Sequence, residues 1–133
     1  MRVVLDTNIL ISAGWKPGGN ESRVIELAKS GLLTVCICTE IEAEYNEVAN
    51  RPKFAKIQSA LSLAIGAITS NAVWVEATPR CKACLDPDDN VLLDCAAAGG
   101  AKYVITGNLA DFPNFWEGIA VINARSLLDQ TGG

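Results

Sequence analysis

Histidine is absent from the 133-residue sequence. This absence excludes a Ser-His-Asp triad, Cys-His catalysis and histidine-ligated zinc. Any chemistry that the chain performs must therefore use carboxylates, thiols, lysine or metal-bound water.

Long hydrophobic runs are also missing. The apolar stretches, such as residues 61–68, are interrupted and fall short of the roughly 20 residues needed to span a bilayer. Asp6 follows only a few apolar residues, so we expect no secretion signal. Because 50% of the 133 residues are hydrophobic, the sequence predicts one folded domain, residues 1–133, in the cytoplasm.

Positive charge is scarce. The 11 Lys and Arg residues against 15 Asp and Glu residues give a net charge of −4. This balance excludes an affinity for nucleic acid that rests on a broad basic face. It does not exclude a nucleic-acid enzyme, because bound divalent cations reverse the sign of a carboxylate pocket.

The chain contains five cysteines, and this odd number favours reduced thiols over a disulfide framework. Cys81 and Cys84 have the CxxC spacing of redox motifs or of half a zinc site, and Cys36 and Cys38 would complete four thiolates. Small buried thiols are the alternative interpretation.

Strand patterns and helix patterns alternate along the chain. Short apolar or β-branched runs predict strands at 2–5, 32–38, 72–75, 103–106 and 120–122. Helical periodicity predicts helices at 21–30, 39–50, 55–70, 87–99 and 124–130, with a Gly/Pro-rich loop at 14–19. Thr39 and Glu42 form a capping-box pattern, and Asp86 is the expected N-cap before Pro87. We expect an α/β fold, a three-layer α/β/α sandwich with a mainly parallel central sheet, whose site lies beyond the carboxyl ends of the strands.

Several carboxylates are expected at that edge. Asp6 directly follows the first strand, where a lone Asp is otherwise a cap or turn residue. Glu42 and Glu44 flank the apolar stripe of their helix, and periodicity does not choose between them. Asp89 heads an apolar stripe, where a carboxylate needs a cation or hydrogen bonds. Asp94 lies about 140° away around the same helix and is interpreted as a surface acid.

Another strand end carries Thr106, Asn108 and Asp111. Their oxygen atoms can face the same edge; a Gly-Asn turn with a loop acid is the alternative. Carboxylates gathered at one edge repel one another unless a cation lies among them, and oxygen-only ligands suit Mg²⁺ or Mn²⁺. These residues predict metal-assisted hydrolysis of a phosphodiester.

Five short segments extend this interpretation: Val3-Val4-Leu5-Asp6-Thr7-Asn8, Glu44-Tyr45 within 39–45, Arg51-Pro52-Lys53-Phe54, Asp86-Pro87-Asp88-Asp89-Asn90 and Val104-Ile105-Thr106-Gly107-Asn108. In this order they resemble the PIN-domain nucleases, particularly a branch described as toxin components of toxin–antitoxin systems. The resemblance extends from Met1 to about Leu128. It implies a Mg²⁺- or Mn²⁺-dependent endoribonuclease that cuts single-stranded RNA, commonly as a homodimer held by an antitoxin.

The resemblance also implies residue roles. The family's catalytic and metal-binding acids correspond to Asp6, Glu44, Asp89 and Asp111, so the resemblance favours Glu44 over Glu42.

Supporting roles are implied for Asn8 and Thr106, which would orient the ligating carboxylates. Many relatives have Asp where this chain has Asn108, so the fourth ligand comes from Asp111 or is absent. Asp94 stands where relatives often have an acid and is a candidate auxiliary.

RNA contact would involve scattered residues along the chain: Trp15 by stacking on a base, and Lys16, Arg23, Arg51, Lys53 and Lys56 by charge. Ordinary solvated cations and a packed loop aromatic are the alternative interpretation for each of them.

Other functions compete with the nuclease. A phosphatase of the haloacid-dehalogenase type needs an Asp two residues after Asp6, where this chain has Asn8. A phosphate-receiver domain needs a lysine near the end of a late strand, whereas Lys102 lies at its beginning. The non-enzymatic alternative is a catalytically degenerate PIN-like module that binds RNA or protein without cutting.

Overall fold

A six-stranded sheet forms the centre of the protein. The computed structural model describes residues 1–132. The strands are β1 (Arg2–Leu5), β2 (Thr34–Ile37), β3 (Val73–Trp74), β4 (Tyr103–Ile105), β5 (Phe115–Trp116) and β6 (Ile119–Ile122). Their order across the sheet is β3-β2-β1-β4-β6-β5, and β5 alone runs antiparallel to its neighbour.

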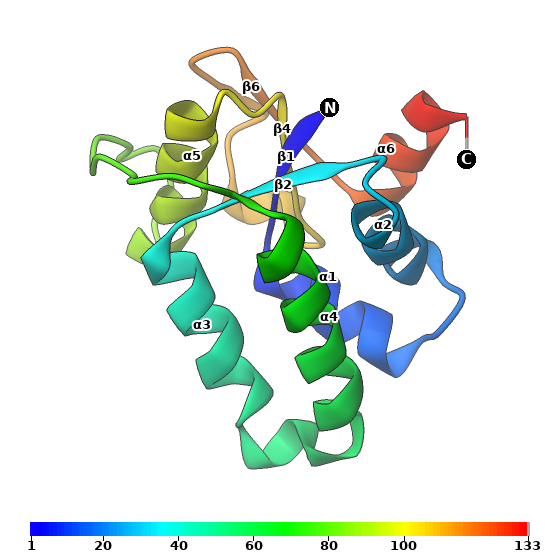
Figure 1. Ribbon diagram of the computed structural model, residues 1–133. Coiled ribbons are helices and arrows are strands. Elements are labelled where there is room, and N and C mark those ends of the chain that lie inside the picture. The colour runs from blue at the N-terminus through cyan, green and yellow to red at the C-terminus, as the bar shows by residue number, and fades with distance from the viewer. Residues whose placement is uncertain (133) are drawn as a thin grey trace.

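Helices cover both faces of this sheet. One face packs on α5, and α2, α4 and α6 lie on the other side of the strands (Figure 1). The helices are α1 (Thr7–Trp15), α2 (Asn20–Lys29), α3 (Thr39–Ala49), α4 (Gln58–Asn71), α5 (Pro87–Gly99) and α6 (Ala124–Thr131), with 3-10 segments η1 (Pro52–Ile57) and η2 (Leu109–Asp111). The expected α/β sandwich with a mainly parallel sheet is confirmed. Within residues 1–132, no helix combines the length and apolarity that a bilayer crossing requires.

β1 is the most deeply buried strand. Val3, Val4 and Leu5 have no exposed surface, because β2 and β4 flank the strand and helices cover its faces. Such a continuous apolar run is typical of a central parallel strand. Burial of one Leu side chain contributes about 1.5–3 kcal/mol to folding. The residue after this strand, Asp6, is therefore carried by a rigid element.

The order of the strands reverses between β1 and β4. The chain extends from β1 to β2 and β3, then returns to place β4 on the opposite side of β1. At such a reversal the segments after the two neighbouring strands diverge, so ligands bind outside their carboxyl ends. Leu5 pairs with Ile105 in the register, which brings the following residues, Asp6 and Thr106, side by side at this reversal.

Among the α-helices and strands, two were not predicted from the sequence. Residues 7–15 form α1, and Phe115–Trp116 forms β5. β5 and β6 are joined by a two-residue turn, in which Glu117 and Gly118 have φ angles of 49° and 81°. Positive φ at both positions is typical of a type I′ hairpin turn, whose usual signal is Asn-Gly or Asp-Gly rather than Glu-Gly.

The start of α3 also differs from the expectation. The predicted capping box of Thr39 and Glu42 is wrong, because Thr39 is already helical and Cys38 occupies the N-cap position without a side-chain cap bond. The Cys38 backbone is still extended as it leaves β2, and its carbonyl accepts the Glu42 N–H at 3.0 Å. In contrast, Asp86 caps α5 as predicted and accepts the Asp88 N–H at 2.9 Å.

The five cysteines are buried free thiols. Cys36 lies in β2 and Cys38 at its end, whereas Cys81 and Cys84 lie in the segment before α5. No group of three or more His, Cys, Asp or Glu side chains within residues 1–132 is placed to hold a metal ion, so the two cysteine pairs do not form a four-thiolate site there.

Gly99, the last residue of α5, lies against β2. A Cβ on Gly99 would lie 2.6 Å from Cys36 Sγ and 2.9 Å from Cys36 Cβ. We expect Gly99→Ala to lower the free energy of unfolding by about 1–3 kcal/mol, the range for an overpacked core, as measured by urea denaturation.

The matched control is Gly66→Ala within α4, where a Cβ would meet open space. Alanine there should raise the free energy of unfolding by about 0.5–1 kcal/mol. Equal effects of the two substitutions would contradict the close packing of α5 on β2.

Candidate active site

Asp6 is the most firmly held carboxylate at the carboxyl edge of the sheet. Its Oδ2 accepts hydrogen bonds from Thr106 Oγ1 at 2.8 Å and from Asn8 Nδ2 at 3.2 Å. Asp6 is 9% exposed, and burial raises the pKa of its carboxyl group while the Thr106 hydroxyl opposes that rise. Neutral donors therefore fix the orientation of a buried acid.

Asn8 and Thr106 connect the segments that follow β1 and β4. Asn8 Nδ2 lies 3.3 Å from Thr106 Oγ1, to which it donates, and Asn8 Oδ1 accepts the Gly107 N–H at 3.0 Å. Thr106 is completely buried and also accepts the Asn108 N–H at 3.0 Å. Such contacts are typical of residues that orient ligating carboxylates. Asn108 takes part through its backbone and is itself exposed.

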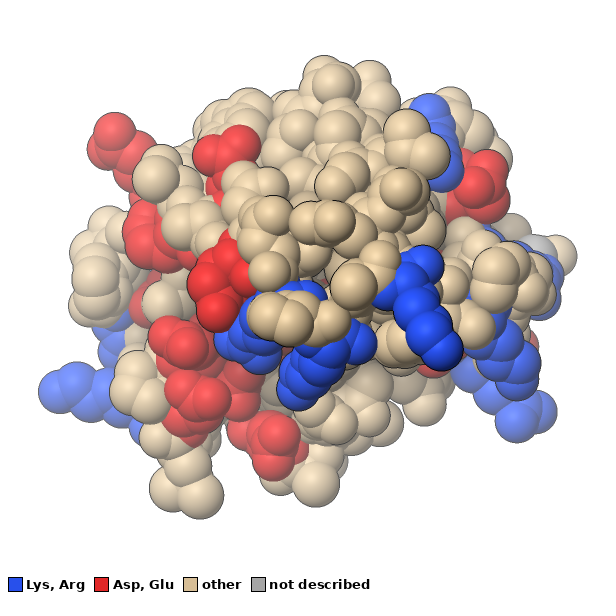
Figure 2. All heavy atoms as spheres, turned by 90° about the horizontal axis from the view of Figure 1, so that it is seen from below, with Lys and Arg blue, Asp and Glu red and all other residues tan. Residues whose placement is uncertain are grey.

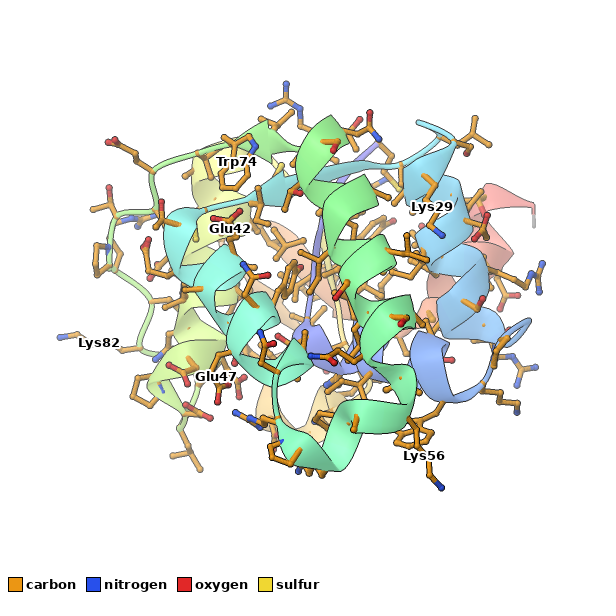
Figure 3. The ribbon with its side chains drawn as sticks, turned by 60° about the horizontal axis from the view of Figure 1, so that its bottom comes forward. Lys29, Glu42, Glu47, Lys56, Trp74 and Lys82 are labelled. Atoms are coloured by element: carbon orange, nitrogen blue, oxygen red, sulfur yellow. The ribbon has the colours of Figure 1, made fainter. Side chains whose placement is uncertain are left out.

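Glu44 reaches the same edge from α3. Thr7, the first residue of α1, donates its hydroxyl to Glu44 Oε2 at 2.9 Å. Burial raises the pKa of Glu44, and the charge of Asp6 raises it further. Glu42, in contrast, lies on the side of α3 toward Trp74 (Figure 3). The structure thus brings Glu44, rather than Glu42, together with Asp6.

Asp89 lies in the first turn of α5, and its pKa is strongly raised. Burial, as the largest cause, and the charges of Asp6, Asp86, Asp111 and Glu44 together raise its pKa to about 7. The electrostatic field at Asp89 therefore comes from residues in four places: after β1, on α3, at the start of α5 and in η2. Figure 2 shows acidic side chains gathered on this end of the molecule, beside a group of Lys and Arg side chains.

Two hollows lie among these acids. A cavity of about 420 Å³ opens between the start of α5 and η2, with Asp86, Asp89 and Asp111 in its lining. A smaller cavity of about 70 Å³ lies between α3 and α5 and is lined by Glu44 and Asp88. Asp111 therefore lies beside Asp89, in the wall of the larger cavity.

The donor set at this edge suits a hard divalent cation. All of its donors are oxygen atoms, and a cation would offset the repulsion that raises the pKa values of Glu44 and Asp89. In the described part of the chain, however, no three His, Cys, Asp or Glu side chains already converge on one ion-sized space. To share an ion, Asp6, Glu44 and Asp89 would have to draw closer together.

Asp94 does not join these acids, and its interpretation as a surface acid is wrong. It is 5% exposed, and its Oδ1 accepts the backbone N–H groups of Cys81 at 2.8 Å and Arg80 at 3.2 Å. The segment before α5 covers this side of the helix, which helical periodicity cannot show. Asp94 lines a separate hollow with Thr78 and anchors the covering segment rather than supporting Asp89.

Two contributors escaped the sequence analysis. Thr7 orients Glu44, as described above. No role was predicted for Tyr45, but its hydroxyl donates to the Leu5 carbonyl at 2.5 Å and ties α3 to the end of β1. The available signal was the phenolic hydroxyl itself, because a buried Tyr usually finds a hydrogen-bond partner.

The fold and the site define a three-layer α/β protein with an acidic edge at the reversal of its strand order. A comparison of the sequence with protein families finds that the PIN domain matches residues 2–110. The chain therefore belongs to the PIN-domain family. PIN domains are generally nucleases, and they typically use divalent metals.

A solved structure with a similar fold is the crystal structure of VapBC2 from Rickettsia felis bound to a DNA fragment from their promoter. The TM-score is 0.60 with 21% sequence identity, and the match covers 92% of this chain and 98% of that chain. At this identity the likeness shows the fold alone. No curated protein matches the chain.

The raised pKa of Asp89 predicts a pH-dependent stability in metal-free buffer. Its pKa is about 7 in the folded protein, against an ordinary value of 3.8. Because the folded state binds this proton more tightly, deprotonation between about pH 4 and pH 7 lowers the free energy of unfolding. We expect Asp89→Asn in EDTA at pH 8 to raise the free energy of unfolding by about 1 kcal/mol after solvent screening, which raises the Tm by a few degrees. At pH 4 the same substitution should change the Tm little.

The control is Asp129→Asn, an exposed acid near the end of α6 and outside this acidic edge, which should change the Tm at pH 8 less than Asp89→Asn does. A destabilising effect of Asp89→Asn at pH 8 would contradict the view that Asp89 is under electrostatic strain.

Proposed function

We propose that the protein is a Mg²⁺- or Mn²⁺-dependent endoribonuclease that hydrolyses phosphodiester bonds of single-stranded RNA. The observation that carries this proposal is the Asp6 carboxylate, held by Thr106 and Asn8 at the strand reversal. Glu44 and Asp89 lie in the same acidic field, and the chain belongs to a family whose members are generally nucleases.

In this proposal Asp6, Glu44 and Asp89 hold the metal ion, with Asp111 as the fourth acid. The bound ion would activate water and offset charge on the leaving oxygen. Thr106 keeps the Asp6 carboxylate in place through its donated hydrogen bond.

Thr7 would orient Glu44 in the same way. Asn108 brings no charge, so Asp111, three residues further on, takes the position of the acid that many relatives have there.

A group of cations supports RNA as the substrate. Arg51 lies just after α3, and its Nη2 is 2.7 Å from Glu47 Oε2. The hydrogen bond to Glu47 raises the pKa of Arg51, and the charge of Glu44 raises that pKa further. Lys53 and Lys56 follow on η1, and Lys56 projects outward (Figure 3). These side chains would bind RNA phosphates next to the acidic edge, which agrees with the adjacent acidic and basic groups in Figure 2.

The remaining RNA-contact candidates lie elsewhere. Arg23 on α2 lines a hollow with Leu128 of α6, so it has no evident role near the acids. Trp15 ends α1 half-exposed and Lys16 follows it, and both remain candidates for contact with a longer RNA.

We also propose that the protein is the toxin of a toxin–antitoxin pair, a homodimer held by an antitoxin in the cytoplasm. The sequence resemblance supports this assignment, and so does the similarity in fold to the VapBC2 structure.

The two acids on α3 offer a matched test of the proposed site. Glu44→Gln should reduce Mn²⁺-dependent cleavage of single-stranded RNA by about 100-fold or more, since even residues that only orient a metal ligand cost about 10–100-fold. Glu42→Gln, two residues away, should keep cleavage within about twofold. RNA cleavage measured with both variants checks this, and equal activity would remove Glu44 from the site.

A catalytically degenerate module is the second candidate function. It is favoured by the absence, within residues 1–132, of three acids already placed around one ion, and by the neutral Asn108. Binding of single-stranded RNA without cleavage at any Mn²⁺ concentration would establish this second candidate and reject the nuclease.

Metal binding can be tested apart from catalysis. Mn²⁺ should raise the Tm of the wild-type protein, because a ligand that binds only the folded state adds about 2.7 kcal/mol at 100 times its Kd. Asp6→Asn should abolish this rise, and Asp129→Asn should retain it. Thermal unfolding measures both variants, and an equal Mn²⁺-induced rise in the Tm of Asp6→Asn and of the wild type would contradict the proposed ligand set.

A further inference from the structure

The 420 Å³ cavity beside Asp89 has an apolar wall that the proposed hydrolysis does not use. This wall is formed by Ala83, Leu85, Ala110, Phe112 and Pro113. Phe112 is buried and packs with the core, whereas Leu85 is fully exposed at 104%. The cavity thus combines a fixed aromatic residue with an aliphatic side chain in solvent, and its volume falls in the range of about 300–1,000 Å³ for small-molecule sites.

The polar part of the lining restricts what the cavity can bind. Its charged residues are Asp86, Asp89 and Asp111, and neither Lys nor Arg lines it. Carboxylates accept hydrogen bonds and repel phosphate. A suitable occupant is therefore a flat, uncharged group with an apolar face and N–H donors on its edge. In an RNA substrate, the nucleobase is the part with this chemistry.

Two carboxylates are available as acceptors for such a base. Asp86 uses Oδ1 to cap α5 through the Asp88 N–H, and its second oxygen remains available. Asp111 is exposed in η2, and no hydrogen bond or ion pair of its carboxylate is found within residues 1–132. A carboxylate can accept a hydrogen bond on one oxygen while its other oxygen holds a different partner.

The four bases differ in whether they can donate hydrogen bonds to both of these carboxylates. Guanine presents two adjacent donors, N1–H and the N2 amino group. Adenine and cytosine each present a single amino group beside an acceptor nitrogen, and uracil presents N3–H between two carbonyl oxygens. A lone pair facing a carboxylate is unfavourable, so guanine is the best partner for this lining.

We propose that the cavity binds a guanine base next to the phosphodiester that is cut. The base packs on Leu85, Phe112 and Pro113, and its Watson–Crick edge donates to one oxygen of Asp86 and one of Asp111, which leaves the other Asp111 oxygen for the metal ion of the proposed nuclease. This inference rests on the proposed nuclease function, and it assigns a sequence preference to the same site.

Cleavage of paired oligonucleotides tests the preference. Two single-stranded RNAs that differ only by G or A at one position should be cut at different rates, with the G-containing RNA cut about tenfold faster and next to G. Leu85→Ala should reduce this ratio severalfold and Ala110→Phe, which fills the cavity, should abolish it. Leu85 is exposed, so Leu85→Ala spares the core and should leave cleavage of G-free RNA within about twofold.

The matched control is Leu63→Ala, an exposed leucine on α4, which should keep the wild-type ratio. Equal cleavage of the G- and A-containing RNAs would overturn the proposal. A uniform loss of activity on all RNAs in Leu85→Ala would also overturn it.

Nucleoside binding separates this proposal from the proposed nuclease. Guanosine, adenosine, cytidine and uridine can be titrated into the metal-free protein by NMR. Tighter binding of guanosine that Ala110→Phe abolishes would support the cavity even if no RNA is cut, in which case the nuclease function fails alone. RNA cleavage with no base preference and no preferred nucleoside would reject the cavity and leave the nuclease in place.

Discussion

Mutually repelling carboxylates are held together at one end of the sheet by neutral hydrogen-bond donors. Thr106 and Asn8 fix Asp6, and Thr7 fixes Glu44. Burial and like charge both oppose ionisation here, as the raised pKa of Asp89 shows. The surrounding fold must supply the free energy that keeps these groups in place, and a bound cation would relieve the repulsion.

The rigidity of the central strands makes this arrangement sustainable. β1 and β4 are buried between two helical layers, so the segments that follow them start from well-defined positions. The Asp6–Thr106 contact joins residues 100 positions apart, and Tyr45 links α3 to the end of β1. Three distant parts of the chain are therefore fixed relative to one another before any ligand binds.

The surface around the acids divides into regions of different chemistry. On one side, Arg51 and the lysines of η1 provide positive charge, where we propose that RNA phosphates bind, despite a net charge of −4 for the whole chain. On another, the cavity lined by Leu85 and Phe112 offers an apolar wall with acidic acceptors. A fold shared by many proteins can carry different specificities in this way, because specificity depends on side chains around the site rather than on the architecture.

Local patterns were sufficient to predict β1, the Asp86 cap of α5 and the appearance of acids after buried strands, because strand burial, capping and helical faces depend on neighbours a few residues away. They could not choose between Glu44 and Glu42, since both border the same stripe; the hydroxyl of Thr7, 37 positions away, distinguishes them. Nor could they show that Asp94 is buried, because the segment carrying Cys81 folds back over it. Those outcomes depend on contacts between distant segments, and such contacts form only when the layers pack.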